Sequence, residues 1–335
     1  MRIVLDAMGG DFAPYEIILG AIEFARKTTD DVTIILVGDA PIIDNCLSMH
    51  NIADLPIQIV HSTQVVDMNE APAAVLRQKK DSSISVGLRM LKNGEADAFV
   101  SAGNTGAVAV AAKHELGMLK GVDRPAIATL VPGPFGATIL VDSGATVNCK
   151  PHNLVQFAKM GACYARYMLK RVQPIVGLLS VGEETDKGNA VTKETFGMLK
   201  DCSLKFYGNV EGYDIFLGKV DVIVCDGFVG NVSLKVIEGV AKGVNAYLKK
   251  ITDAKNWKTL LNRILLAPII GKIVKQYDAN KFGGAPLLGV AGTCIIAHGN
   301  SCADSISNAL ERAREIIAIK LNMHILEAIS CDETV

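Results

Sequence analysis

Two glycine-rich segments, each directly after a short apolar run, have the composition of an anion-binding site. The first is DAMGGD at residues 6–11 and the second is SAGNTGA at residues 101–107. Glycine lets the backbone come close to a ligand, and the start of the following helix offers free N–H groups and the positive end of its dipole. We therefore expect these segments to hold a phosphate group. The residues expected to contact it are Gly9, Gly10, Asp11, Ser101, Thr105 and Gly106.

Each segment also has a purely structural interpretation. In the first, a tight turn between strand and helix would use both glycines, and Asp11 would only cap the helix. In the second, close packing of a helix on a sheet would explain Gly106 and the neighbouring alanines. That packing does not explain Ser101, Asn104 and Thr105 together, which makes the second segment the stronger anion-site candidate.

Two further loops also follow apolar runs. GEETDKGN at residues 182–189 carries Lys187, whose charge could neutralise a phosphate, although a solvated charged loop has the same composition. DVIVCDGFVGN at residues 221–231 ends on Asn231. Ligands of α/β sheets bind at the carboxyl ends of parallel strands, so four such loops predict one shared crevice.

Several well-known motifs are absent from the sequence. It has no dinucleotide fingerprint, no phosphate loop of the nucleoside triphosphatases, no G-x-S-x-G and no H-E-x-x-H. The eight cysteines include no C-x-x-C pair, which disfavours a zinc ribbon or a disulfide framework. Lys and Arg number 34 against 35 Asp and Glu, so no global field attracts nucleic acid, and we expect no nucleic-acid partner.

The elements that would position these loops alternate between short β-branched runs and longer runs of helical periodicity. This pattern predicts an α/β fold with a mostly parallel sheet, and we expect one unit over residues 1–335 with a helical tail after Cys225. The expected strands are 3–5, 33–37, 57–60, 98–101, 127–130, 138–141, 175–179 and 222–225. The expected helices are 14–27, 82–92, 105–118, 153–170, 190–200, 230–250, 286–297 and 304–321.

A basic and apolar stretch within this tail is expected to form a protruding helical hairpin over about residues 253–279. Residues 254–277 contain no acidic residue, and basic residues flank the apolar ones, which suits a membrane surface. A dimerisation arm would have the same composition, and both interpretations can hold at once. The apolar residues expected to act there are Trp257, Leu261, Ile264, Leu265, Leu266, Ile269 and Ile270.

Five segments in order resemble the PlsX family of bacterial phosphate acyltransferases over essentially the whole chain. They are DAMGGDFAP, SAGNTGA, GEETDKGN, DVIVCDGFVGNVSLK and GAPLLGVAGTCIIAHGNS, starting at residues 6, 101, 182, 221 and 284. The resemblance implies a three-layer α/β/α fold related to phosphate acetyltransferases and isocitrate-dehydrogenase-like enzymes. One departure is Thr146, where an asparagine is expected, and it puts a direct ligand role at that position in doubt.

The resemblance also implies the reaction and its partners. An acyl group would pass from acyl carrier protein to inorganic phosphate, and a glycerol-3-phosphate acyltransferase would use the acyl phosphate for phospholipid synthesis. The enzyme would be a cytoplasmic homodimer associated with the inner membrane surface, without a metal or an organic cofactor. The opening residues lack the features of a signal peptide, which agrees with a cytoplasmic location.

Phosphate can attack a thioester without a nucleophilic side chain, so we expect positioning and charge stabilisation to supply most of the rate. Asn104 and Lys187 are the candidates for holding phosphate and offsetting its charge. Asn231 or His298 could stabilise the oxyanion or protonate the departing thiol. The acidic carrier protein would dock on a basic patch, for which the candidates, equally consistent with a solvated helix face, are Lys159, Arg166, Lys170 and Arg171.

Two rival functions are open at this stage. A dehydrogenase of the related fold is disfavoured because the dinucleotide fingerprint and a clustered set of carboxylates are missing. A membrane scaffold without catalysis would use the basic apolar arm alone. The small polar residues of the glycine-rich loops would be unnecessary in such a scaffold, which counts against it.

Overall fold

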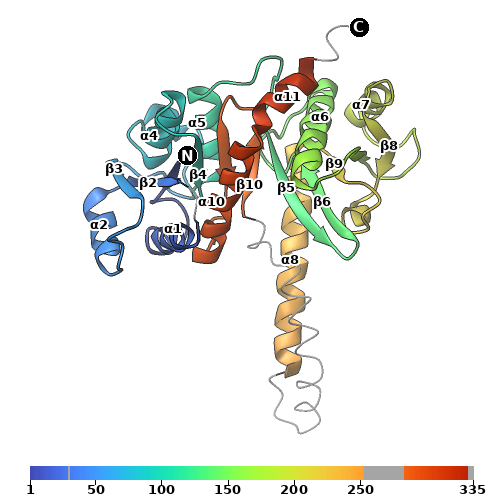
Figure 1. Cartoon of the computed structure of the whole chain (residues 1–335). Coiled ribbons are helices and arrows are strands. Elements are labelled where there is room, and N and C mark those ends of the chain that lie inside the picture. Colours follow the sequence, from blue (N-terminus) through green and yellow to red (C-terminus); the bar gives the residue numbers. More distant parts are fainter. Residues whose placement is uncertain (29–30, 253–282, 331–335) are drawn as a thin grey trace.

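A computed structural model describes residues 1–28, 31–252 and 283–330. Within these residues one eleven-stranded sheet runs through the molecule in the order β3-β2-β1-β4-β11-β10-β5-β6-β9-β7-β8 (Figure 1). Most neighbouring strands are parallel, as the sequence pattern predicts. The expected hairpin over residues 253–279, including the apolar residues from Trp257 to Ile270, lies entirely outside the described residues.

The sheet consists of two parallel blocks and two linking strands. The first block contains β3 (Ile57–His61), β2 (Thr33–Gly38), β1 (Arg2–Asp6), β4 (Ala98–Ser101) and β11 (Thr293–Ile296). The second block contains β6 (Gly136–Val141), β9 (Val222–Val224), β7 (Ile175–Leu179) and β8 (Lys205–Val210). The linking strands are β10 (Ala285–Leu288) and β5 (Ala126–Gly133).

The linking strands determine where the carboxyl ends of the two blocks lie. β10 is antiparallel to β11 and to β5, and β5 is antiparallel to β6, so the blocks run in opposite directions. Pro286 of β10 pairs with Ile295 of β11, and the following residue of β10, Leu287, pairs with Ile127 of β5. The residue after Ile127 in β5 pairs with Val141, the last residue of β6. The end of β6 is therefore level with the end of β11. The loops that follow these two strands therefore start at the same level of the sheet, at the join between the blocks.

Helices cover both faces of the sheet, because successive strand residues point to opposite sides. Ile3 and Leu5 pack into one core and Val4 into the other. The first core involves α1 (Tyr15–Lys27), α2 (Ala40–Ser48), α6 (Pro151–Met168), α7 (Ala190–Lys200), α10 (Ala303–Ala318) and α11 (Leu321–Ser330). The second involves α3 (Ala74–Arg77), α4 (Ser83–Lys92) and α5 (Thr105–Glu115). This is the expected three-layer α/β/α arrangement.

The prediction of a helix over residues 286–297 and of an almost entirely helical tail after Cys225 is wrong. The segment forms β10 and β11, separated by a turn in which Gly289 has a φ of +89°. Leu288 and Ile295 pack into one core, whereas Leu287 and Ile296 pack into the other. A strand that is apolar on both faces cannot be distinguished from a buried helix by periodicity alone.

Other differences are smaller. The sequence pattern did not indicate β8, α2, α3, the short 3-10 helix η1 (Gly212–Ile215) or α11 as a separate helix. The helix expected over 304–321 ends at Ala318, and Lys320 adopts a φ of +52° before α11 begins. No helix among the described residues is both long and apolar enough to cross a membrane.

α8 (Gly227–Thr252) differs from the other helices because it extends away from the sheet (Figure 1). Its first turns lie at the join between the blocks and contact β6. From its second turn onward an exposed row of valines follows one side of the helix at intervals of four residues. The row consists of Val232, Val236, Val240 and Val244.

Candidate active site

The loops after β1 and β4 are joined by one buried carboxylate. The Ser101 hydroxyl donates to Asp6 Oδ2 at 2.7 Å, and the Met8 N–H donates to Asp6 Oδ1 at 3.1 Å. Ser101 Oγ in turn accepts the Gly103 N–H at 3.0 Å. Burial raises the pKa of Asp6, against the opposing effect of its hydrogen bonds. Ser101, a predicted phosphate ligand, thus has its hydroxyl turned toward Asp6.

Glycines let these loops pack against each other and against the loop after β11. A Cβ atom on Gly9 would lie 2.7 Å from the Gly103 nitrogen. Gly10 has a φ of +107°, and the following N–H of Asp11 donates to the Gly299 carbonyl at 2.7 Å. We call the surface formed by residues 6–11, 101–106 and 297–300 the cradle. The structure therefore brings the two predicted anion segments together.

The start of α5 supplies the free backbone donors of the cradle. The Asn104 side chain caps the helix by accepting the Ala107 N–H at 3.0 Å. The N–H groups of Thr105 and Gly106 have no hydrogen-bond partner among the described residues, and Thr105 is exposed. Two adjacent helix-terminal amides with an exposed threonine can bind an oxyanion. This arrangement agrees with the sequence interpretation of Thr105 and Gly106.

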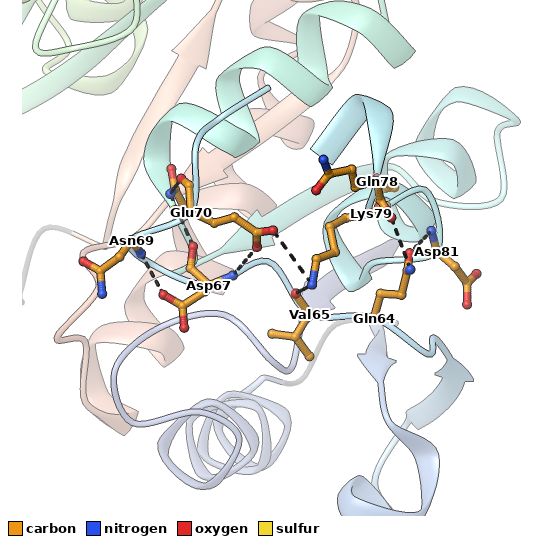
Figure 2. A network of polar contacts seen from close by, with 10 residues as sticks. Gln64, Val65, Asp67, Asn69, Glu70, Gln78, Lys79 and Asp81 are labelled. Carbon is orange, nitrogen blue, oxygen red and sulfur yellow. Dashed lines mark hydrogen bonds and ion pairs between the residues drawn. The ribbon is translucent and has the colours of Figure 1, made fainter. Parts of the chain in front are cut away.

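Asn104 has a second set of contacts that the sequence did not indicate. Its Nδ2 donates to the carbonyls of Met68 at 3.0 Å and Glu70 at 2.9 Å. These carbonyls belong to the segment between β3 and α4, drawn in Figure 2, in which Lys79 Nζ donates to the Val65 carbonyl at 3.1 Å. Both the Oδ1 and the Nδ2 atom of Asn104 are therefore already hydrogen-bonded within the protein. The side chain positions the segment over the cradle rather than offering a free donor.

The second block contributes a loop organised by another buried carboxylate. Asp142, directly after β6, accepts the N–H groups of Ile127, Gly144 and Ala145 on Oδ1 at 2.8 to 2.9 Å. Its Oδ2 accepts the Thr146 N–H at 2.6 Å. Burial raises the pKa of Asp142, although these four amides act to lower it. The carboxylate fixes the shape of residues 142–146.

Thr146, where the sequence departs from the family pattern, has a structural contact. Its hydroxyl donates to the Pro125 carbonyl at 2.9 Å, and the residue is buried. α8 begins beside it, since the Gly227 N–H donates to the Thr146 carbonyl at 2.9 Å. One turn later Asn231 Nδ2 donates to the Ser143 carbonyl at 3.3 Å. The exposed Asn231 therefore lies at the join, against the loop that Asp142 shapes.

His298 connects the cradle to α8. Its Nε2 lies 3.4 Å from Lys235 Nζ and 3.5 Å from Glu238 Oε1. Lys235 Nζ also contacts Glu238 Oε2 at 3.0 Å. The hydrogen bond from His298, followed by the effect of Lys235, lowers the pKa of Glu238 to about 2. The sequence interpretation missed Lys235 and Glu238, although they lie four and seven residues after Asn231 and so share its helix face.

Lys187 lies farther along the sheet edge. It is exposed in the loop after β7, which β9 separates from β6, and its side chain forms no hydrogen bond or ion pair with the described residues. Its predicted role in neutralising phosphate stays a prediction.

The basic patch expected to bind carrier protein lies away from the join. Arg171 pairs with Asp221 at 2.9 Å, and its guanidinium is near Gly136 at the start of β6, whereas the crevice is at the other end of that strand. Arg166 donates to the Val172 carbonyl at 3.3 Å. Lys159 is half-buried and Lys170 is exposed. The docking role of these residues also stays a prediction.

Comparison with known proteins adds independent information. A family model described as "Fatty acid synthesis protein" matches residues 1–323. The phosphate acyltransferase of Thermoanaerobacterium thermosaccharolyticum is 44% identical over 325 residues, which cover 97% of this chain and 96% of the relative. That of Halothermothrix orenii is 46% identical over 319 residues, which cover 95% of each chain.

Two solved structures have a similar fold at low sequence identity. A phosphotransacetylase from Streptococcus pyogenes has a TM-score of 0.62 and 16% identity, and the match covers 96% of this chain and 94% of that one. A branched-chain phosphotransacylase from Enterococcus faecalis has a TM-score of 0.54 and 14% identity, with 94% and 99% covered. At these identities the likeness concerns the fold alone, and it agrees with the expected phosphate-acetyltransferase-like architecture.

Proposed function

The chain belongs to the phosphate acyltransferases, a family of transferases in fatty acid synthesis, and on that premise we propose that it moves a fatty acyl group from acyl carrier protein to inorganic phosphate. Acyl transfer to phosphate follows from the family. The carrier-protein donor and the use of the acyl phosphate in making phosphatidic acid are the finer parts of the proposal. The observation that carries it is the cradle, in which Gly9 packs against Gly103 and the next helix start leaves the amides of Thr105 and Gly106 without a partner among the described residues.

The reaction needs no covalent enzyme intermediate. A phosphate oxygen forms a bond to the thioester carbonyl carbon, and the carbonyl electrons move onto oxygen. When the carbonyl re-forms, the carbon–sulfur bond breaks and its electron pair leaves on sulfur. A thiol of this kind has a pKa of roughly 8.5, so its thiolate departs readily and takes up a proton from solvent or from a nearby acid.

The residues of the crevice divide into two groups. The amides of residues 9–10 and 105–106 would hold phosphate, and Asn104 would keep the start of α5 in place. Asn231 and His298 would face the thioester from the other side and donate to the oxyanion. Lys187 would offset charge from the neighbouring loop. Holding the reactants in this way supplies rate through orientation and charge stabilisation.

We propose a homodimer that associates with the inner membrane surface and passes its product to a glycerol-3-phosphate acyltransferase there. The exposed valines of α8 support an apolar partner surface. An acyl phosphate with a long chain is amphipathic, so a membrane surface next to the enzyme would take up its apolar chain on release.

The test mixes the full-length protein with acyl-loaded carrier protein, with and without inorganic phosphate. It follows free thiol and hydroxylamine-trappable acyl phosphate together, and a parallel series uses the coenzyme A thioester of the same acyl chain. Both signals should require phosphate and should be stronger with carrier protein. Thiol release without acyl phosphate would indicate a thioesterase instead. A preference for the coenzyme A thioester would overturn the carrier-protein donor while leaving acyl transfer to phosphate in place.

A further inference from the structure

Three charged or titratable side chains form a bridge from α8 to the cradle. Glu238 uses its two oxygens for different partners, Oε2 for Lys235 Nζ at 3.0 Å and Oε1 for His298 Nε2 at 3.5 Å. His298 immediately precedes Gly299, whose carbonyl accepts the Asp11 N–H. We call Lys235, Glu238 and His298 the bridge. It lies where the two blocks of the sheet meet.

The hydrogen bond on the other side of the imidazole fixes its tautomer. His298 Nδ1 accepts the Asn300 N–H at 3.2 Å, and a ring nitrogen that accepts carries no proton. In the neutral ring the proton is therefore on Nε2, which faces Lys235 Nζ at 3.4 Å. The single Nε2 proton is directed at Glu238 Oε1 over a long distance of 3.5 Å, so an oxyanion placed between the two nitrogens would share or take over that proton while Lys235 donates a second one.

Exposure distinguishes the donors from the carboxylate. The side chains of Lys235 and His298 are 57% and 42% exposed, whereas that of Glu238 is 17% exposed. A ligand in the crevice can therefore reach the two donors, while Glu238 lies beneath them. The carboxylate stays charged throughout the working pH range, because the pKa of Glu238 is lowered to about 2. Its role is then to hold the donors in place.

We propose that Glu238 is a positioning residue that holds Lys235 and His298 as paired donors to the oxyanion formed when phosphate attacks the thioester. This inference rests on the proposed function and adds Lys235 and Glu238 to the residues that act on the carbonyl side of the reaction. The oxyanion carries more charge than the ground-state carbonyl oxygen, so two fixed donors bind the transition state more tightly than the substrate.

The experiment compares variants of the full-length protein in the phosphate-dependent acyl transfer assay. Glu238→Gln keeps the size and removes the charge, Glu238→Asp keeps the charge, and Lys235→Gln removes one donor. Lys242→Gln is the matched control, because this exposed lysine lies on the same helix and forms no hydrogen bond or ion pair with the described residues. Thermal unfolding is measured for every variant.

We expect Glu238→Gln and Lys235→Gln to lower kcat by about tenfold to a thousandfold while KM for phosphate changes less than about twofold, as for removal of a transition-state donor. Glu238→Asp should recover part of kcat, and Lys242→Gln should behave as wild type. Wild-type kcat in both glutamine variants would overturn the inference. If Glu238→Gln is too unstable to assay, Glu238→Asp decides. If Glu238→Asp is then as stable as the wild type but recovers no kcat, the inference is also overturned. An inactive wild type would instead contradict the proposed function.

Discussion

At the scale of single residues, two buried aspartates determine the shape of the crevice. Asp6 ends β1 and ties the loops after β1 and β4. Asp142 follows β6 and accepts three N–H groups of its own loop and that of Ile127 in the linking strand β5. Each carboxylate works through backbone N–H groups. The loops that face substrate are therefore held by residues that lie behind them.

This arrangement makes Asp142→Asn informative. An amide keeps one acceptor oxygen but presents an NH₂ group in place of the other, so at least one of the four N–H groups loses its partner. An unsatisfied buried N–H costs about 1–3 kcal/mol, and we expect the free energy of unfolding to fall by that amount. Urea denaturation measures it. Asp186→Asn, on an exposed loop, should leave the midpoint unchanged, and an unchanged midpoint for Asp142→Asn would contradict the structural role.

The sequence located the loops of the site better than it located the contacts of their side chains. The loops that carry Gly9, Thr105 and His298 do pack together, since Gly9 contacts Gly103 and the Asp11 N–H donates to the Gly299 carbonyl, while their roles stay predictions. The hydrogen bonds from Asn104 to the carbonyls of Met68 and Glu70 could not be predicted. These residues are more than thirty positions away, and nothing in their local sequence indicates a contact with Asn104. Ser101 is similar, since its partner Asp6 lies 95 residues earlier in the chain.

At the scale of elements, α8 combines two features. Its first turns carry Asn231, Lys235 and Glu238 to the join between the blocks, and another side of the helix presents valines, from Val232 to Val244, that are between 49% and 60% exposed. A solitary helix of this kind gains little stability from its backbone hydrogen bonds alone. Burying its valines against an apolar partner would stabilise it, by about 1.5–3 kcal/mol for each side chain fully buried.

We expect this row of valines to mediate self-association. The double variant Val240→Lys, Val244→Lys would place two charges in an apolar contact. It should therefore shift from dimer toward monomer. Sedimentation velocity over a range of concentrations measures the shift. Lys242→Gln is the control, since residue 242 points about 200° around the helix from Val240. A double variant as dimeric as the wild type would place the interface elsewhere, and a monomeric wild type would contradict the dimer.

The strands and helices that the sequence predicted well are those with a short β-branched run or a clear helix start. β1, β2 and β4 follow short β-branched runs, and α1 and α5 follow recognisable helix starts. The prediction missed β10 and β11, whose faces are buried like those of β1, β2 and β4, because β10 contains no β-branched residue and the two short strands together form one apolar run. This error matters for function, since β11 delivers His298 to the cradle.

At the scale of the whole molecule, the opposed blocks of the sheet explain why one crevice can use loops from both. In a sheet with all strands parallel, the carboxyl-end loops would form a single row along one edge. Here β10 and β5 reverse the direction, and the cradle of the first block faces α8 of the second. Phosphate and thioester can then approach each other from opposite sides.

Phosphate binding in the cradle should therefore stabilise the whole fold. A ligand that binds only the native state adds RT ln(1 + [L]/Kd), or about 2.7 kcal/mol at a hundredfold excess over Kd, so the unfolding temperature should rise with phosphate and then level off. Chloride at equal ionic strength controls for salt.

The variant Gly9→Ala tests whether the cradle is responsible, because its Cβ would press against the Gly103 backbone and deform the two loops. Gly197→Ala is the matched control, since a Cβ there meets no atom within 4 Å. We expect Gly197→Ala to keep the saturable phosphate effect and folded Gly9→Ala to lose most of it. Equal protection of both variants would show that phosphate binds outside the cradle, and the roles given to Thr105 and Gly106 would then have to be abandoned.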